Sequence, residues 1–328
     1  MRGRATSRIV RSILASLVLL ACGFQVTHAE NYKLGHVGPP THPYQLGALK
    51  FAELVKQGTQ GKIVIDVFPS SQLGNERDLI EGLQIGTVDF VLSSTGPMAT
   101  FDPKFGAPDL PFIFRDLKHA YAVLDGAVGK ELFDSLKNKG IIGLAWFENG
   151  FRQVTNSRRP IEKPEDLKGL KIRTMENPIH VAFFKELGVD PTPMAFGEVF
   201  SALEQKVVDG QENPVAAVLT AKFFEVQKYL AMTGHVYTAV PLMVRGDLFR
   251  SLPPEHQKVI VNAAREASIY ERRLLADQEK SGIEELKKKG MTITYPDRAK
   301  LREATAPVYR KFEKTIGREL IQKILDTP

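Results

Sequence analysis

Two arginines are the side chains most suited to chemistry in this chain, because each stands near the end of an expected strand. Arg173 lies near the end of the expected strand 171–174, shortly before an expected helix that starts at Pro178. Arginine stays charged in proteins, and its planar fork matches a carboxylate through two parallel hydrogen bonds. Open α/β sheets bind ligands where strands end, so Arg173 is a candidate anion site. The alternative is a solvated surface charge, the common state of arginine.

Arg152 follows an apolar run, 141–147, in the stretch WFENGFRQVTNSRRPI. Trp146 offers an apolar wall, while Glu148 and Asn149 offer hydrogen-bonding groups. A carboxylate directly after a buried strand is costly to bury without a partner. The sequence leaves three partners open for Glu148: Arg152, a ligand hydroxyl, or water.

Asn213 precedes Pro214 in the stretch VVDGQENPVAAV, which predicts a helix start. Asn213 suits the N-cap and Pro214 the first helical position. Asn213 either caps the helix only or also faces a ligand carboxylate at the positive helix end. Two arginines and this helix end would together make an anion site. Acceptors and donors for hydroxyl groups would come from Glu148, Glu176, Asn149 and Asn177.

No catalytic motif accompanies these residues. The chain has no Gly-x-Ser-x-Gly elbow, His-Glu-x-x-His pair, Walker loop or Gly-x-Gly-x-x-Gly turn. Its seven histidines are scattered without metal-ligand spacing, so neither a metal nor a cofactor is expected. The enzymatic alternative is a secreted hydrolase that uses Glu148 and Glu176 as its two carboxylates.

Residues 1–29 are typical of a cleaved secretory signal peptide, which predicts a periplasmic protein. Four arginines precede the apolar run 13–21, and Thr27-His28-Ala29 is an acceptable cleavage site. The alternative is a lipoprotein signal with lipidation at Cys22. Without this segment the formal charge falls from +6 to +2 and no cysteine remains. The mature chain therefore gives no reason to expect nucleic acid, and it is stabilised by a core rather than by disulfides.

Strand-like and helix-like segments alternate after Glu30, which predicts an α/β fold. Pro241 lies inside the expected strand 237–244 and favours an edge strand or a bulge there. The longest expected helix, 255–289, would span about 50 Å and so cross two domains. Its alternative is a coiled-coil oligomerisation helix, although Arg265 and Glu271 interrupt the heptads. The other expected strands are 32–37, 62–68, 88–92, 141–147, 171–174, 207–209 and 229–232, and the other helices are 44–57, 77–85, 117–124 and 129–139.

Five stretches resemble the solute-binding receptors of TRAP (tripartite ATP-independent periplasmic) transporters. They are SSQLGNERDLIEGLQIGTVDF, DLPFIFRD, GFRQVTNSRRPI, PEDLKGLKIRTMENP and FSALEQKVVDGQENP, in that order along nearly the whole mature chain. The resemblance implies a two-lobed periplasmic binding protein fold with a ligand cleft between lobes and a long helix spanning both. Lobe I would comprise 30–150 with about 239–275, and lobe II 151–238 with about 276–328, sharing the helix 254–289.

The resemblance also implies residue roles. Arg173 matches the principal carboxylate-binding arginine of the family, Asn213 the asparagine that assists it, and Arg152 a second arginine. Glu76 matches an acidic position of the first lobe that reaches the cleft, and His42 lies in a loop that lines it.

The ligand class follows from two short stretches. Residues 146–150, which include Trp146, and residues 175–177 resemble members that take sugar acids such as hexuronates or aldonates. Pantoate-like and C4-dicarboxylate acids stay open, as does a role as a ligand sensor. The resemblance implies delivery of the acid to integral-membrane permease subunits.

Overall fold

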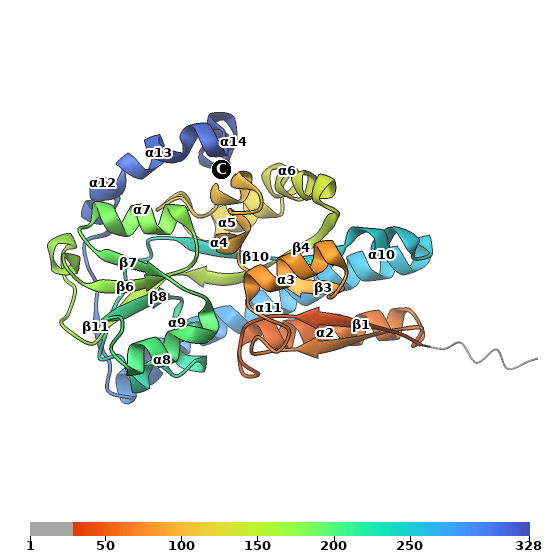
Figure 1. The fold of residues 1–328 in the computed structure, drawn as a ribbon, viewed down its shortest axis with the longest axis horizontal. Helices are drawn as coiled ribbons and strands as arrows, with labels where there is room; N and C mark the ends of the chain where they lie inside the picture. Colours follow the sequence, from red (N-terminus) through yellow and green to blue (C-terminus); the bar gives the residue numbers. More distant parts are fainter. Residues whose placement is uncertain (1–28) are drawn as a thin grey trace, which may run out of the picture.

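The computed structural model describes residues 29–328, which fold into two sheets with helices packed around them (Figure 1). The expected signal peptide and the alternative lipidation at Cys22 lie outside the described residues, except for Ala29. Strands and helices alternate along most of the chain, so the predicted α/β class is confirmed.

The first sheet has five strands in the order β2-β1-β3-β10-β4. Parallel pairing joins β1 to β2 and β3, while β10 runs antiparallel to both β3 and β4. Its strands are β1 (Glu30–Gly35), β2 (Ile63–Phe68), β3 (Phe90–Leu92), β4 (Ile141–Phe151) and β10 (Tyr237–Arg245). The helices before β4 and directly after β10 are α2 (Pro43–Gly58), α3 (Glu76–Ile85), α4 (Thr95–Met98), α5 (Leu117–Leu124), α6 (Ala127–Leu136) and α10 (Gly246–Ser251), with the 3-10 helices η1 (Pro103–Gly106) and η2 (Lys137–Lys139).

The second sheet has six strands in the order β11-β9-β5-β8-β6-β7. Its strands are β5 (Gln153–Asn156), β6 (Lys171–Thr174), β7 (Asp190–Pro193), β8 (Gly210–Asn213), β9 (Tyr229–Ala231) and β11 (Thr292–Thr294). The helices between β5 and β9 are α7 (Pro178–Glu186), α8 (Val199–Glu204) and α9 (Val215–Thr220), with η3 (Pro164–Leu167), η4 (Phe196–Glu198) and η5 (Phe223–Glu225).

The chain passes twice between the sheets through short extended segments. Strand β4 ends at Phe151 and β5 begins at Gln153, so Arg152 alone separates the two sheets on this crossing. The return runs from β9 to β10 through residues 232–236. The two crossings touch, because the Arg152 backbone N–H donates to the Val236 carbonyl at 2.8 Å.

The long helix α11 (Pro254–Lys288) joins the two sheets along their length (Figure 1). Its first part packs against α2. The close contact there requires Gly47 of α2, because a Cβ at this position would lie within 3 Å of both Glu271 and Phe147. Its last part lies against α9, where Gly282 faces Val215 in the same way. The prediction of one helix crossing both halves is confirmed. The buried face of α11 packs against α2, β4 and α9 of the same chain, rather than against a second helix in a coiled coil.

Helices α12 (Arg298–Thr305), α13 (Pro307–Ile316) and α14 (Arg318–Asp326) form the C-terminal end. Helix α13 contacts both η1 and α7, and α14 contacts α6. The C-terminal segment therefore touches elements of both halves, and the residue bounds of the two lobes stay a prediction.

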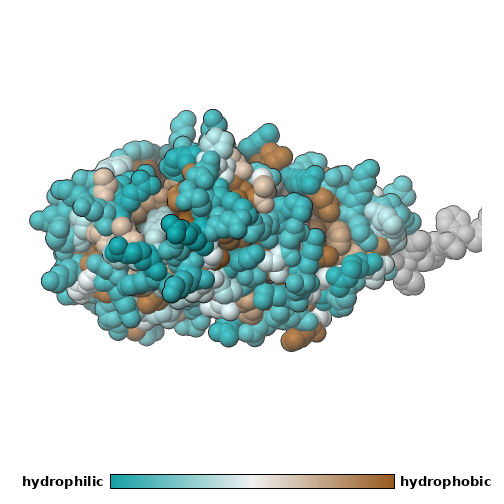
Figure 2. Space-filling view, turned by 90° about the horizontal axis from the view of Figure 1, so that it is seen from above, coloured by the Kyte–Doolittle hydropathy of each residue, from teal (hydrophilic) through white to brown (hydrophobic). Residues whose placement is uncertain are grey.

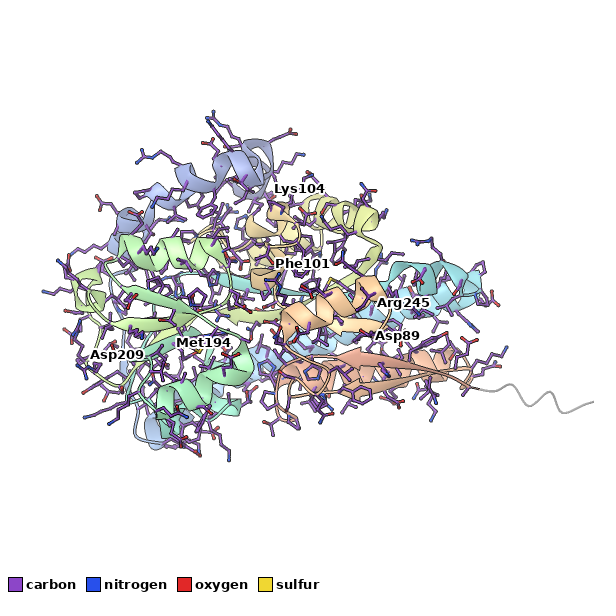
Figure 3. The ribbon with its side chains drawn as sticks, viewed as in Figure 1. Asp89, Phe101, Lys104, Met194, Asp209 and Arg245 are labelled. Atoms are coloured by element: carbon purple, nitrogen blue, oxygen red, sulfur yellow. The ribbon has the colours of Figure 1, made fainter. Side chains whose placement is uncertain are left out.

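One strand prediction was wrong. Residues 207–209 form a turn, and the strand is β8, Gly210–Asn213. Asp209, labelled in Figure 3, instead accepts a hydrogen bond from the Lys171 backbone N–H at 2.9 Å. For Pro241 the expectation was an edge strand or a bulge, and the bulge is confirmed, because the β10–β4 register shifts on both sides of this residue. Strand β10 itself lies inside the sheet rather than at its edge. Strand β3 pairs only with residues 242–244 of β10, so no ladder partner on that side needs a proline N–H.

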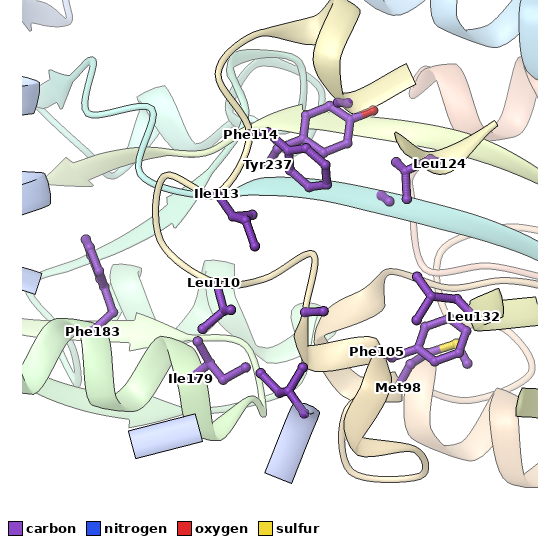
Figure 4. Packing of buried hydrophobic residues seen from close by; sticks show 14 of the residues in the cluster. Met98, Phe105, Leu110, Ile113, Phe114, Leu124, Leu132, Ile179, Phe183 and Tyr237 are labelled. Carbon is purple, nitrogen blue, oxygen red and sulfur yellow. The ribbon is translucent and has the colours of Figure 1, made fainter. Parts of the chain in front are cut away.

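The apolar core lies on both sheets and in the segment that joins them. In Figure 4, Leu110 of the segment after η1 lies next to Ile179 of α7, within one continuous buried cluster. On the outer face drawn in Figure 2, hydrophilic residues dominate and hydrophobic ones are scattered. Across residues 29–328, no helix combines the length and the apolar character that crossing a bilayer demands.

Candidate ligand-binding site

A cavity of about 380 Å³ is lined by residues from the elements of both sheets. The first-sheet half contributes the loop before α2 and the first turn of that helix, the start of α3, and Ser94 between β3 and α4. The second-sheet half contributes the ends of β6 and β8. The lining residues are Val37, Gly38, His42, Tyr44, Glu76, Ser94, Asn149, Arg152, Arg173, Met175, Phe196, Asn213 and Ala217.

Arg173 is the free cation of this cavity. Its side chain is only 2 % exposed, and Nε and Nη2 donate to the carbonyl of Met194 at 3.1 and 2.7 Å. Figure 3 labels Met194 on the second-sheet side of the molecule. Nη1 is buried and has no hydrogen-bond partner among the described residues. Burial, with a smaller contribution from Arg152, lowers the pKa of Arg173 to about 10, so the guanidinium stays charged at neutral pH.

Arg152 also lines the cavity, but its charge is already neutralised. Neither Arg152 nor Glu212 is exposed, and Arg152 Nη2 lies 2.9 Å from Glu212 Oε1 while Nε donates to Oε2. Arg152 Nη1 donates to Thr238 Oγ1 at 3.3 Å. Although burial opposes ionisation, Arg152 and two neighbouring histidines hold the pKa of Glu212 well below its usual range. Arg152 can therefore shape the cavity, whereas Arg173 is better placed to bind a new anion.

Asn213 lies between these groups, but the prediction that it is an N-cap was wrong. It is the last residue of β8, and Pro214 occupies the N-cap position of α9 without a side-chain cap. Asn213 Oδ1 accepts from Arg152 Nη2 at 3.1 Å, and Nδ2 donates to Gln211 Oε1 at 2.6 Å. An amide nitrogen carries two hydrogens, so one remains for a ligand in the cavity.

Glu76 supplies a carboxylate on the first-sheet side. Its Oε1 accepts from the Ser94 backbone N–H at 2.6 Å and from Ser94 Oγ at 2.7 Å, with Ser93 Oγ at 3.4 Å. These contacts fix the carboxylate at the first turn of α3, where the helix dipole favours negative charge. Oε2 has no protein donor in the described part of the chain, and it can accept from a ligand hydroxyl.

His42 and Tyr44 add donors next to Glu76. His42 Nδ1 accepts from the Tyr44 backbone N–H at 3.1 Å, which places the ring hydrogen on Nε2. Burial lowers the pKa of His42 to about 3, so the ring is neutral. The Tyr44 hydroxyl is buried without a partner in the described residues, and so is Asn149 Oδ1. Together with Arg173 Nη1, three orphaned polar atoms belong to residues around one cavity, a pattern that a polar ligand would relieve.

Glu148 and Trp146 do not line this cavity. Glu148 accepts a hydrogen bond from the Tyr121 hydroxyl at 2.5 Å. Tyr121 was not among the three partners that the sequence left open for Glu148. Burial raises the pKa of Glu148 to about 7. Trp146 stacks on Phe133 at 4.4 Å between ring centroids and lines a separate surface groove near α6 and α11.

Glu176 and Asn177 also lie outside the lining. Glu176 is partly exposed. Asn177 caps α7 by accepting from the Ile179 backbone N–H at 2.7 Å, and its Nδ2 donates to Asp109 Oδ2 at 3.1 Å. Its role in this structure is therefore structural.

Several residues of the site were missed. Tyr44 and Ser94 carry the polar contacts described above, and Met175, Phe196 and Ala217 form apolar walls. Glu212 stands next to Asn213 in the stretch QENP, so it could have been noticed from the sequence. Because it is buried in β8, this carboxylate needs a cation, and Arg152 supplies it. No cluster of three or more metal-ligating side chains occurs within residues 29–328.

Comparison with known proteins identifies the class to which this architecture belongs. Residues 34–315 match the family described as "Bacterial extracellular solute-binding protein, family 7". The chain belongs to this family. The predictions of a TRAP-type receptor, and of a binding protein rather than an enzyme, are thereby confirmed.

Similar proteins include ones named for sugar acids or solved with them. The 2,3-diketo-L-gulonate-binding periplasmic protein YiaO of Escherichia coli is 41 % identical over 300 residues, 90 % of this chain and 92 % of that protein. A TRAP periplasmic solute-binding protein from Polaromonas sp. JS666, solved with D-erythronate, has a TM-score of 0.89 and 46 % identity, covering 90 % of this chain and 98 % of its own. DctPAm of Advenella mimigardefordensis, solved with galactonate, has a TM-score of 0.89 and 37 % identity, covering 91 % and 97 %. The two-lobed fold is thereby confirmed.

Proposed function

We propose that this family 7 protein captures an open-chain sugar acid outside the cytoplasm and delivers it to the membrane permease of a TRAP transporter. The observation that carries the proposal is Arg173 Nη1, a buried guanidinium nitrogen that has no hydrogen-bond partner in the described part of the chain and belongs to a residue lining the cavity. A buried donor of this kind is costly unless a ligand satisfies it. The permease enters the proposal through the family alone.

In the proposed complex the ligand carboxylate binds Arg173 and the free hydrogen of Asn213 Nδ2. Arg152 stays paired with Glu212 and fixes Asn213 through Oδ1. The cavity then offers one anion-binding end, as a monocarboxylate requires.

The opposite wall suits hydroxyl groups rather than a second carboxylate. Glu76 brings negative charge there, which repels a second carboxylate but accepts from hydroxyls. His42 Nε2 and the Tyr44 hydroxyl are donors for the same hydroxyl groups. This arrangement favours erythronate-like or galactonate-like acids over a C4-dicarboxylate, and the ligands of two similar solved structures, D-erythronate and galactonate, support the same class.

A thermal-shift screen tests the ligand class directly. The purified protein would be heated with D-erythronate, D-galactonate, D-glucuronate, pantoate and succinate, and hits would be confirmed by calorimetry. At a hundredfold excess over Kd, binding stabilises the folded state by about 2.7 kcal/mol, a clear rise in melting temperature. Sugar acids should bind with one-to-one stoichiometry and remain chemically unchanged. Preferential binding of succinate would overturn the sugar-acid assignment, and turnover would overturn the receptor role.

A further inference from the structure

A buried chain of charged side chains runs behind the cavity, and His180 stands at its centre. Its ring lies on α7 between two carboxylates, with Nε2 3.5 Å from Asp109 Oδ1 and Nδ1 3.8 Å from Glu212 Oε1. All three side chains are at most 1 % exposed. Neither ring nitrogen makes a hydrogen bond within the described residues, so the two contacts are at ion-pair distance only.

The balance of charge requires a cation at His180. Glu212 is paired with Arg152, whereas the hydrogen-bond donors to Asp109 among residues 29–328 are neutral: Thr95 Oγ1 at 3.2 Å and Asn177 Nδ2 at 3.1 Å. A fully buried carboxylate without a cation is strongly disfavoured. Within residues 29–328, His180 is the basic side chain in ion-pair distance of Asp109. An imidazolium there leaves two carboxylates balanced by two cations.

The neighbouring histidine is in a different state. His235 Nε2 lies 3.2 Å from Glu212 Oε2, and its Nδ1 lies 2.7 Å from Thr233 Oγ1. Burial lowers the pKa of His235, while at His180 the contacts with Asp109 and Glu212 outweigh burial and raise the pKa. The other charged group in contact with Glu212 is Arg152, whose Nη2 donates to Oε1 at 2.9 Å.

The chain of contacts connects the two halves of the molecule. Asp109 lies in the segment between η1 and α5 and contacts Thr95 at the start of α4. His180 and Asn177 belong to α7, and Glu212 belongs to β8 and holds Arg152 and, through it, Asn213. A proton on His180 thus ties the first-sheet segment to the strand that carries one wall of the cavity.

We propose that His180 is a positioning residue that, as a buried imidazolium, ties Asp109 to Glu212 and so holds the cavity in its binding geometry. Loss of this proton at high pH leaves Asp109 without a cation, loosens the link between the halves, and weakens binding of the acid. This inference rests on the proposed function, because the acid is its readout. The protonation of His180 itself does not depend on any ligand.

The first test is nitrogen NMR of the histidine rings in the ligand-free protein from pH 6 to pH 9. The His180 signals are assigned by their absence in His180→Gln. Both His180 nitrogens should carry hydrogen at pH 7, while His235 should be neutral. A neutral His180 ring at pH 6 would overturn the inference, whether or not any sugar acid binds.

The second test is calorimetry with D-galactonate over the same pH range, or with the acid selected by the screen if D-galactonate does not bind. Wild-type affinity should fall about tenfold as His180 loses its proton, and His180→Gln should be weak and show no such fall. His256→Gln, at the start of α11, is the matched control and should keep the wild-type profile. A His180→Gln protein with wild-type affinity and profile would refute the inference. If that variant does not fold, the His180 signals are assigned in the wild-type protein by through-bond NMR, and their titration decides.

Discussion

Arg152 and Glu212 form an ion pair in which neither side chain is exposed, and this pairing leaves Arg173 as the cavity cation without a carboxylate partner. The two arginines of the site therefore have different roles, although both line the same cavity. One stabilises the fold at the crossing between the sheets, and the other is available to an incoming acid. The predictions below separate these roles.

Arg173→Lys should weaken sugar-acid binding by about 3 kcal/mol, more than a hundredfold in Kd. Lysine keeps the charge but loses the planar fork that binds a carboxylate at two points. The melting temperature without ligand should change little, because Arg173 makes no ion pair in the described structure. Calorimetry and thermal melts check both statements. Arg245→Lys, at the far end of the first sheet beside Asp89 (Figure 3), is the control, and near-native affinity in Arg173→Lys would contradict the role of Arg173.

Glu212→Gln should lower the free energy of unfolding by about 3–5 kcal/mol, because it leaves Arg152 buried without its counter-charge. Urea unfolding monitored by circular dichroism measures the change. Glu81→Gln removes an exposed ion pair with Arg77 and should cost less than about 1 kcal/mol. An equal loss of unfolding free energy in the two variants would show that the buried Arg152–Glu212 pair contributes no more to stability than an exposed ion pair.

Glu76→Gln should weaken sugar-acid binding by about 1.5–3 kcal/mol, since a charged acceptor for hydroxyl groups becomes a neutral one. The fold should persist, because the amide oxygen can still accept from Ser94. Calorimetry with D-galactonate gives the change in Kd. Glu81→Gln, on the same helix but exposed, serves as the control here too. An unchanged Kd would remove Glu76 from the ligand contacts.

Glu148→Gln should change how stability depends on pH. Burial raises the folded-state pKa of Glu148 to about 7 from an unfolded value of 4.5, so its contribution to stability is fully present below 4.5 and is lost as pH rises towards 7. Glutamine cannot ionise and avoids this loss. The variant should gain on wild type by about 2–3 kcal/mol between pH 4.5 and pH 7.5. Urea unfolding at several pH values tests this, and parallel pH profiles for the two proteins would argue against a raised pKa.

Much of the fold could be predicted because local patterns repeat within single elements. The alternation in 62–68 and the uninterrupted run 255–289 each depend on neighbours in sequence, and both predictions agree with β2 and α11. Pro241 correctly indicated a bulge, but the sequence could not exclude an edge strand, because the fit of proline in a central strand depends on how short β3 is. That length is a property of another part of the chain.

The site was predictable where residue type alone limits the options. Arg173 could be found because an arginine at the end of a strand has few roles. Partners set by tertiary contact could not be found in the same way: Glu148 meets Tyr121, 27 residues away, and Arg152 meets Glu212, 60 residues away. Asn213 was placed near the ligand for an incorrect reason, since the strand β8, rather than a helix cap, positions it.

The single-residue crossing at Arg152 has a mechanical consequence. On this crossing, any rotation of one sheet against the other must be absorbed by backbone torsions beside the residue that is locked to Glu212 and touches the cavity wall. Arg152 therefore belongs both to a crossing between the sheets and to the wall of the ligand cavity. A substitution at Arg152 that changes which acid fits the cavity should also change how easily the two sheets rotate against each other. Ligand selectivity and the rates of ligand binding and release should therefore change together.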